Sequence, residues 1–405
     1  MKIQFFILLW IGLNLLCFRV TALELYGDAS LQARWFPQSP LFAQQQSVDG
    51  GIVVEPALYA ELAPTVSLTL SGLYRYDVND SNRSHGDVRE AYVLTYGDWG
   101  DTAWEVRIGL GRVFWGVAEL HNIVDVVNQL DLVEHPRDRP KLGQPMVHLT
   151  LSGAWGIAES FLLPYHRTRT FPSLAGRLRS RFEIETENIY ESDHAEKHLD
   201  FALRYSHSVG IVDFGLSAFS GTNRVPIFLP RLHVERPPTL IPYYEQISHF
   251  GLDLQLTTAA LLYKVEAIRR EGESNLLGVK DPYSALILGA ERLLDGIFGT
   301  PWSLTLLGEW SFDEREELAT SIYANDLFIA GFLAFNDVQG TELTVGVLMD
   351  LTHSSQVLNL DFKRRLSDSW SIRLEAIVNA KADPEDLTYD SRKDSFLGVG
   401  FTLSY

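Results

Sequence analysis

The segment TVSLTLSGLYRY, from Thr65 to Tyr76, alternates apolar and polar side chains. Successive side chains of an extended chain point to opposite faces, so alternation at every second position predicts a β-strand. One face of this strand carries Val66, Leu68, Leu70, Tyr74 and Tyr76. The other face carries Thr65, Ser67, Thr69, Ser71 and Arg75. The segment therefore predicts a strand with one apolar and one polar face.

The same pattern recurs along the chain, for example at residues 23–35, 303–312 and 370–381. Each run is about ten residues long, the length that a tilted strand needs to cross a bilayer. Aromatic residues gather at the ends of the runs, where the girdles of a membrane barrel would lie. Examples are Tyr74, Tyr76, Trp310 and Phe312. A soluble β-sandwich also alternates, so periodicity alone leaves that fold open.

The links between the runs alternate between short and long. Short links are predicted at 63–64, 98–101, 154–156, 207–210, 257–258, 295–301, 337–340 and 366–369. Long links are predicted at 37–50, 77–85, 113–145, 164–197, 220–245, 271–282, 313–324 and 382–394, while 353–355 is short although a long link is expected there. Such sorting is typical of an up-and-down membrane barrel with tight periplasmic turns. We predict a transmembrane antiparallel barrel of about 18 strands, with 16 as the alternative.

Both ends of the chain support export to an outer membrane. Residues 1–22 have a short positive start, an apolar core and a small-x-small sequence ending at Ala22, which predicts a secretory signal peptide. Cleavage near Ala22 would leave residues 23–405 as the barrel. It would also remove the only cysteine, Cys17, and change the net charge from −18 to −20 with the loss of Lys2 and Arg19. A cysteine-free exported chain fits a Gram-negative envelope protein.

The last residues alternate as well, with Leu397, Val399, Phe401, Leu403 and Tyr405 on one face. A final strand ending in an aromatic residue resembles the signal that outer-membrane barrels present to the barrel-assembly machinery. We therefore expect that machinery, outer-membrane lipid and lipopolysaccharide as partners. The 52 acidic against 34 basic residues argue against nucleic acid as a partner, because phosphate neutralisation needs a basic surface.

The polar faces of the predicted strands carry charges of both signs, including Arg75 and Arg107. Such charges are costly in a dry core but stable in water, so they predict a wide polar lumen. The alternative is that they form ion pairs between strands and stabilise the wall.

The long link at 113–145 is predicted to fold into this lumen as a constriction or plug, because long loops with apolar residues are more often folded than free. An outer cap and a helix beside a strand remain alternatives. Apolar spacing within 119–133 is compatible with a short helix. The candidate pore residues of this long link, including Arg112 directly before it, are Arg112, Trp115, Glu119, Asp125, Asn128, Asp131, Arg137, Arg139 and Lys141.

Basic residues concentrate in residues 134–181, in contrast to the acidic chain as a whole. In an extended conformation, the alternating arginines would form a ladder that could guide anions or bind lipid phosphates. The candidates are Arg167, Arg169, Arg177, Arg179 and Arg181. Pairing with the acidic run at 183–193 is the alternative explanation for the ladder.

Several stretches resemble a group of uncharacterised porin-like outer-membrane β-barrel proteins of Gram-negative proteobacteria. The resemblance is carried by residues 111–145, LLPYHRTRTFP at 162–172, GRLR at 176–179, and Asn336-Asp337 with Thr341-Glu342. It extends to the C-terminus and covers most of the mature chain. It implies a porin-like barrel but assigns no substrate and no catalytic residue.

Two functional hypotheses follow from the sequence. The first is a channel for diffusion or facilitated transport of small polar or anionic solutes. The second is a non-conducting barrel that acts as a lipid or apolar-solute transporter, a surface-binding protein or a barrel-wall hydrolase. A soluble periplasmic β-protein is a third interpretation. The sequence has no Gly-x-Ser-x-Gly, His-Glu-x-x-His or Gly-x-x-x-x-Gly-Lys motif, so we predict no enzyme, cofactor or metal site.

Overall fold

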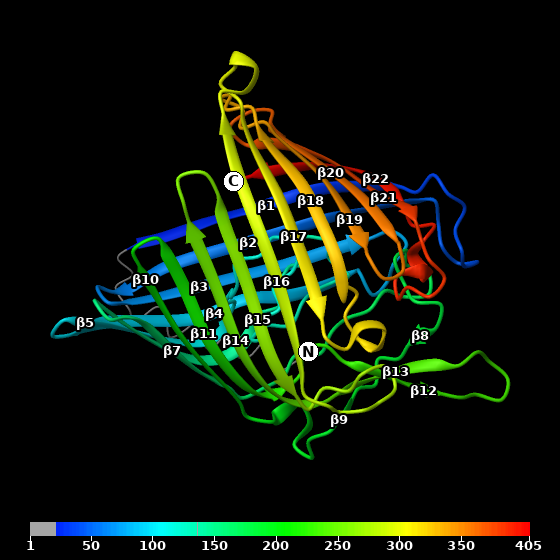
Figure 1. The fold of residues 1–405 in the computed structure, drawn as a ribbon, viewed down its shortest axis with the longest axis horizontal. Helices are drawn as coiled ribbons and strands as arrows, with labels where there is room; N and C mark the ends of the chain where they lie inside the picture. The colour runs from blue at the N-terminus through cyan, green and yellow to red at the C-terminus, as the bar shows by residue number, and fades with distance from the viewer. Residues whose placement is uncertain (1–21, 136) are drawn as a thin grey trace.

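The alternating segments form strands that pair with their neighbours in chain order (Figure 1). The computed structural model describes residues 22–135 and 137–405. Eighteen strands make one antiparallel sheet. These are β1 (Ala22–Trp35), β2 (Val48–Ala63), β3 (Val66–Asp77), β4 (His85–Trp99), β5 (Thr102–Gly111), β6 (Gln144–Gly153), β7 (Gly156–Leu163), β10 (Asp200–Val209), β11 (Val212–Thr222), β14 (Gln246–Thr257), β15 (Leu262–Glu271), β16 (Tyr283–Asp295), β17 (Ser303–Asp313), β18 (Asn325–Ala334), β19 (Glu342–Asp350), β20 (Gln356–Arg365), β21 (Trp370–Lys381) and β22 (Phe396–Ser404).

The last strand closes the sheet on the first. β22 pairs with β1 in a register that runs from Asp28 opposite Ser404 to Trp35 opposite Leu397. Closure leaves neither terminal strand of the sheet with an open edge, which is the condition for a sheet surrounded by hydrocarbon. The predicted up-and-down barrel of 18 strands is therefore confirmed. The predicted signal peptide lies outside the described residues apart from Ala22, which begins β1.

The predicted sorting of links is observed at most positions, although 296–302 and 335–341 at one end are as long as 78–84 at the other. One end of the barrel has the short turns, which are 64–65, 100–101, 154–155, 210–211, 258–261, 296–302, 335–341 and 366–369. The other end has the long loops, which are 36–47, 78–84, 112–143, 164–199, 223–245, 272–282, 314–324, 351–355 and 382–395. The shortest link of the second set is 351–355, which agrees with the short link that the sequence predicts at 353–355. Both described termini lie at the short-turn end.

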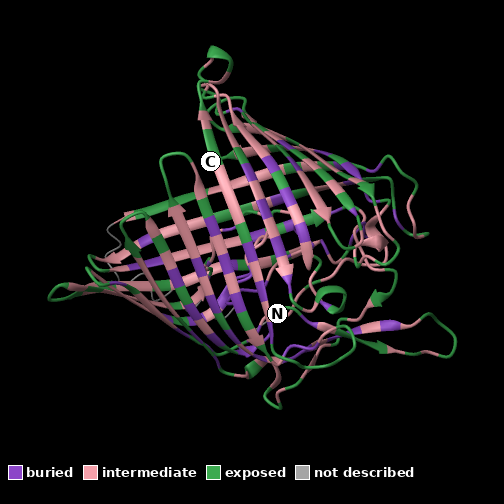
Figure 2. Ribbon diagram, in the orientation of Figure 1, coloured by how far each residue is buried: buried purple, intermediate pink, exposed green. Residues whose placement is uncertain are grey.

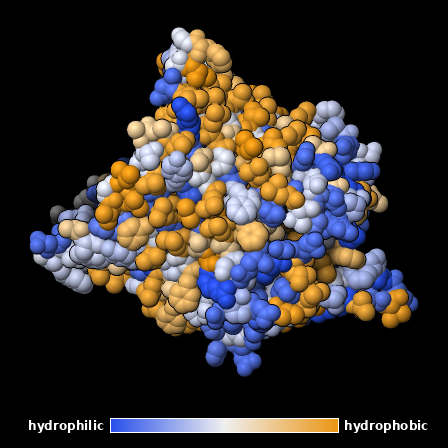
Figure 3. All heavy atoms as spheres, viewed as in Figure 1, coloured by the Kyte–Doolittle hydropathy of each residue, from blue (hydrophilic) through white to orange (hydrophobic). Residues whose placement is uncertain are grey.

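Strand β3 shows how the two faces differ. Tyr74 and Tyr76 point outward and are 58% and 53% exposed, whereas Arg75 and Asp77 point into the barrel and are 2% and 4% exposed. Exposed and less exposed residues alternate in the same way along the neighbouring strands (Figure 2). Apolar residues cover much of the strand surface on the face that Figure 3 shows. This distribution is the reverse of a soluble domain and is the pattern of a membrane barrel.

A small second sheet lies at the long-loop end, where the β12–β13 hairpin extends away from the barrel (Figure 1). It consists of β8 (Glu183–Ile184), β9 (Ile189–Tyr190), β12 (Ile227–Arg231) and β13 (Thr239–Tyr244). Four single-turn 3₁₀ helices complete the described elements: η1 (Ala195–Lys197), η2 (Ile297–Gly299), η3 (Glu316–Leu318) and η4 (Tyr389–Ser391). None of the helices in the described part of the chain is long and apolar enough to cross a membrane.

Candidate lumen constriction

Residues 112–135 and 137–143, which we call the lumen loop, fold into the barrel. Trp115, Val124 and Val127 are buried in an apolar cluster with side chains of the surrounding wall. The Trp115 ring meets the Phe161 ring of β7 edge to face, with 5.7 Å between centroids. Burial of these side chains against the wall favours an inward position of the loop. The prediction that this long loop folds inward is confirmed.

Residues 119–133, whose apolar spacing is compatible with a short helix, form turns and irregular chain and no helix. The nearby amides bond to two carboxylates of the wall instead. Glu266 Oε1 on β15 accepts hydrogen bonds from the backbone nitrogens of Val117 at 2.7 Å and Ala118 at 3.0 Å. Glu309 on β17 accepts from the backbone nitrogens of Glu119 and Leu120, both at 2.8 Å. Hydrogen bonds to a charged acceptor are stronger than neutral ones. The two carboxylates therefore satisfy backbone amides that would otherwise bond within a helix.

The lumen loop also contacts two strands further along the wall. Arg137 Nη2 lies 2.8 Å from Asp361 Oδ2 on β20, and Arg373 Nη2 on β21 lies 3.0 Å from Asp138 Oδ1. His135 Nε2 lies 2.9 Å from an oxygen of Glu375 on β21. The loop, which begins after β5 and ends before β6, therefore crosses the lumen to the part of the wall that runs from β15 to β21.

A third set of contacts fixes the lumen loop to the first strands. Glu134 is paired with Arg75 of β3, and Asp131 Oδ2 lies 2.6 Å from Arg89 Nη2 of β4. Burial raises the pKa of Glu134, but the hydrogen bond and charge of Arg75 outweigh it and hold that pKa below its usual range. Glu134 therefore stays ionised near neutral pH and keeps its pairing with the wall.

The base of the lumen loop is closed by internal contacts. Asn128 Oδ1 accepts from the backbone nitrogen of Val113 at 3.0 Å, and its Nδ2 donates to the carbonyls of Gly111 and Leu142. Lys141 is paired with Asp125. Burial raises the pKa of Asp125 and lowers that of Lys141, while the mutual attraction opposes both shifts. Asn128, Asp125 and Lys141 therefore maintain the shape of the loop.

The other predicted pore residues occupy different positions. Arg112 is paired with Glu90 at 2.8 Å, and the Glu119 carboxylate accepts from Lys264 at 2.8 Å. Arg107 lies on β5 with its guanidinium 4.6 Å above the Tyr92 ring. Trp115 is 2% exposed, so it anchors the loop and presents little surface to a solute. Sequence reasoning missed the anchoring role of Glu266 and Glu309, since a contact between residues so distant in the chain leaves no local pattern.

The predicted arginine ladder is not formed. Leu178 has a φ of +60°, so the alternation of Arg177, Arg179 and Arg181 does not put them on one extended face. Arg177 pairs with Asp394 at 2.7 Å and Arg181 with Asp390 at 2.9 Å, both in the last long loop. Arg179 lies over the Phe42 ring, with its guanidinium carbon 3.9 Å from the centroid.

The acidic run at 183–193 does not pair with this arginine segment either. Its Glu185 and Glu187 pair with Arg231, and Glu191 pairs with Lys280 at 2.8 Å. Of the two earlier arginines, Arg167 pairs with Asp87 of β4 at 2.5 Å. Arg169 faces a cavity beside the lumen loop.

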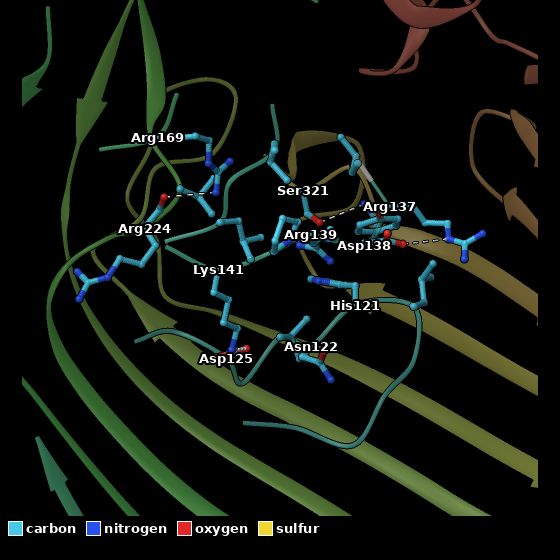
Figure 4. A pocket seen from close by; sticks show the side chains of 18 of the residues that line it. His121, Asn122, Asp125, Arg137, Asp138, Arg139, Lys141, Arg169, Arg224 and Ser321 are labelled. Atoms are coloured by element: carbon cyan, nitrogen blue, oxygen red, sulfur yellow. Dashed lines mark hydrogen bonds and ion pairs between the residues drawn. The ribbon is translucent and has the colours of Figure 1, made fainter. Parts of the chain in front are cut away.

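This cavity has a volume of about 1020 Å³ and lies between the lumen loop and other long loops (Figure 4). Its lining includes Arg137, Arg139 and Lys141 of the lumen loop, Arg169 of the next long loop and Tyr323 of the β17–β18 loop. Arg112, Glu119, Asp125, Asn128 and Arg177 also line it, whereas Trp115, Asp131 and Arg75 do not. The cavity therefore brings together some of the predicted pore residues and two arginines of the predicted ladder, Arg169 and Arg177.

The chain is similar to outer-membrane proteins of known structure, at low identity. OprB of Pseudomonas putida matches with a TM-score of 0.48 and 8% identity, over 95% of this chain and 94% of that one. OmpT of Vibrio cholerae with loop L8 deleted matches with a TM-score of 0.45 and 10% identity, over 95% of this chain and 99% of that one. A mutant of Rhodopseudomonas blastica porin matches with a TM-score of 0.44 and 9% identity, over 95% of this chain and 100% of that one. No family model and no curated protein matches the chain. The fold assignment therefore rests on the strand pairing of the chain itself.

Proposed function

We propose that this protein is an outer-membrane channel for small polar or anionic solutes, with the lumen loop setting its bore. The observation that carries the proposal is the charged interior crossed by one anchored loop. Eighteen strands enclose more space than side chains of the wall can fill, so a polar lumen of this width holds water where loops do not occupy it. A loop bonded to the wall at both sides would give that lumen a defined cross-section.

The outer membrane is the proposed location. The apolar outer face supports membrane insertion, and the predicted signal peptide supports export. Long loops at the end opposite both termini would then face the exterior, as in other barrels of this class. The final strand β22, with Tyr405 directly after it, would be presented to the barrel-assembly machinery.

Planar-bilayer recording of the purified, folded barrel tests the channel. We expect stepwise conductance that rises when residues 120–130 are replaced by a short Gly-Ser linker. Glu105→Gln is a suitable control, because Glu105 is on the inner wall and pairs at 3.6 Å with Arg107, which is outside the lumen loop. A folded barrel that never conducts would refute the channel, and a variant of unchanged conductance would refute the role of the lumen loop.

A non-conducting barrel is the second candidate, and one observation favours it. The lumen loop contacts β3, β4, β15, β17, β20 and β21, as a plug would. In that case the native barrel would be silent in bilayers, and the linker variant would open it. The same two proteins therefore separate the constricted channel from the plugged barrel.

A further inference from the structure

The cavity beside the lumen loop has an excess of positive charge. Eleven Arg and Lys residues line it, against seven Asp and Glu residues. The chain as a whole has the opposite balance, with 34 basic and 52 acidic residues. The cavity is therefore a positive region inside an acidic protein, and such a region attracts anions.

Most of this positive charge is already neutralised. Nine of the eleven cations form an ion pair with a carboxylate of the protein. Arg139 and Arg169 are the other two, and neither has an ion pair within residues 22–135 and 137–405. They come from different long loops and line the same cavity (Figure 4). The uncompensated charge of the cavity is thus concentrated in two guanidinium groups.

Arg169 is held by neutral groups alone. Its Nε donates to Gln129 Oε1 at 3.1 Å, and its Nη2 donates to the carbonyl oxygen of Arg224 at 3.4 Å. Burial lowers the pKa of Arg169 to about 10, and the positive charge of Arg139 acts in the same direction. A guanidinium in such surroundings stays charged at neutral pH and gains from a counter-anion.

Arg139 lies beside an aromatic group. Its guanidinium carbon is 5.7 Å from the centroid of the Tyr323 ring, which stacks on His121 at 4.8 Å. The Nδ1 atom of His121 is buried and has no hydrogen-bond partner in the described residues. Phe171 and Ile322 line the same cavity. Apolar and aromatic surface therefore lies close to the unpaired charge.

We propose that this cavity binds an organic anion, a carboxylate or phosphate monoester with an apolar or aromatic body. Arg139 and Arg169 would bind the anionic group, because the guanidinium fork matches both carboxylate and phosphate oxygens. Tyr323 and Phe171 would contact the apolar body. This inference rests on the proposed channel and names its class of solute.

The first test uses the unmodified full chain, purified and folded in detergent, with isothermal titration calorimetry. Benzoate and phenyl phosphate should bind at least about tenfold more tightly than neutral benzamide, because charge-assisted hydrogen bonds are lost with the amide. The tighter of the two anions identifies the head group. Equal affinity for benzoate and benzamide would overturn the proposal. Inorganic phosphate that binds as tightly as phenyl phosphate would overturn the apolar contact.

The second test uses Arg139→Gln and Arg169→Gln, each expected to weaken benzoate binding by about tenfold. Arg269→Gln is the matched control, since Arg269 pairs with Glu314 at 3.0 Å and does not line the cavity. Unchanged affinity in both cavity variants would overturn the assignment of these arginines. Bilayer recording of the same samples separates the two proposals. Charge-dependent binding without conductance would refute the channel alone, whereas conductance without such binding would refute the organic-anion site alone.

Discussion

Glu266 accepts a hydrogen bond from the backbone nitrogen of Val117 at 2.7 Å, across 149 positions of the sequence. This contact joins the wall of the barrel to the loop that crosses its lumen. The same oxygen of Glu266 accepts from Ala118, so one carboxylate holds two consecutive amides. Glu309 holds the next two. The position of the lumen loop therefore depends on buried charge of the wall as well as on apolar packing.

Glu266→Gln should loosen the lumen loop. The amide retains one acceptor oxygen but loses the charge and places an NH₂ group near donors of the loop. We expect a loss of about 1–3 kcal/mol in stability and larger, noisier conductance steps. Thermal unfolding followed by gel mobility and bilayer recording would check both effects. Glu105→Gln serves again as the control, and equal behaviour of the two variants would contradict the anchoring role.

The pair formed by Asp138 and Arg373 should hold the far side of the loop. Asp138→Asn and Arg373→Gln should each increase conductance, because each removes one charge of the pair. The double variant should change conductance by less than the sum of the two single changes, because both substitutions break the same contact. Single-channel conductance of the four proteins forms a double-mutant cycle. Changes that add in the double variant would show that this pair does not position the loop.

Acidification should release the lumen loop below about pH 4. Burial raises the pKa of Asp138, but the Arg373 hydrogen bond and the charge of His135 outweigh it and depress that pKa, as Arg75 does for Glu134. A depressed carboxyl pKa contributes stability above the unfolded value of about 4, and this contribution is lost as pH falls through the folded value. Conductance should thus rise as the pH falls from about 5 into strong acid. Conductance that stays unchanged over this acid range would contradict this assignment.

A charged substitution on the outer face of the barrel should destabilise the inserted protein. Leu203 lies on β10 and is 59% exposed, on the face that we propose contacts lipid. Leu203→Arg should destabilise the inserted barrel by about 2–4 kcal/mol if the residue lies near the bilayer midplane. Leu232→Arg, in the turn of the β12–β13 hairpin, should have little effect. Insertion into liposomes, measured by gel mobility, compares the two, and similar losses would argue against a lipid-facing position for Leu203.

Much of the barrel could be predicted from the sequence because its determinants are local. In β3, the alternation around Arg75 follows from the two-residue period of an extended strand. The links at 64–65 and 112–143 differ in length in the printed sequence itself. Strand number and the common side of both termini follow from counting such runs and links. None of these features requires knowledge of a distant partner.

The site required the tertiary structure because its determinants are pairings between distant residues. Arg177 was a candidate for an anion path, but the fold places Asp394 beside it and neutralises it. Arg139 and Arg169 have the same side-chain chemistry and no such partner, and only their positions in the fold distinguish them. The sequence alone therefore determined that this chain forms a closed barrel with an apolar exterior. The tertiary structure decided which charges remain unpaired inside it, since an ion pair depends on proximity in space and strand periodicity does not.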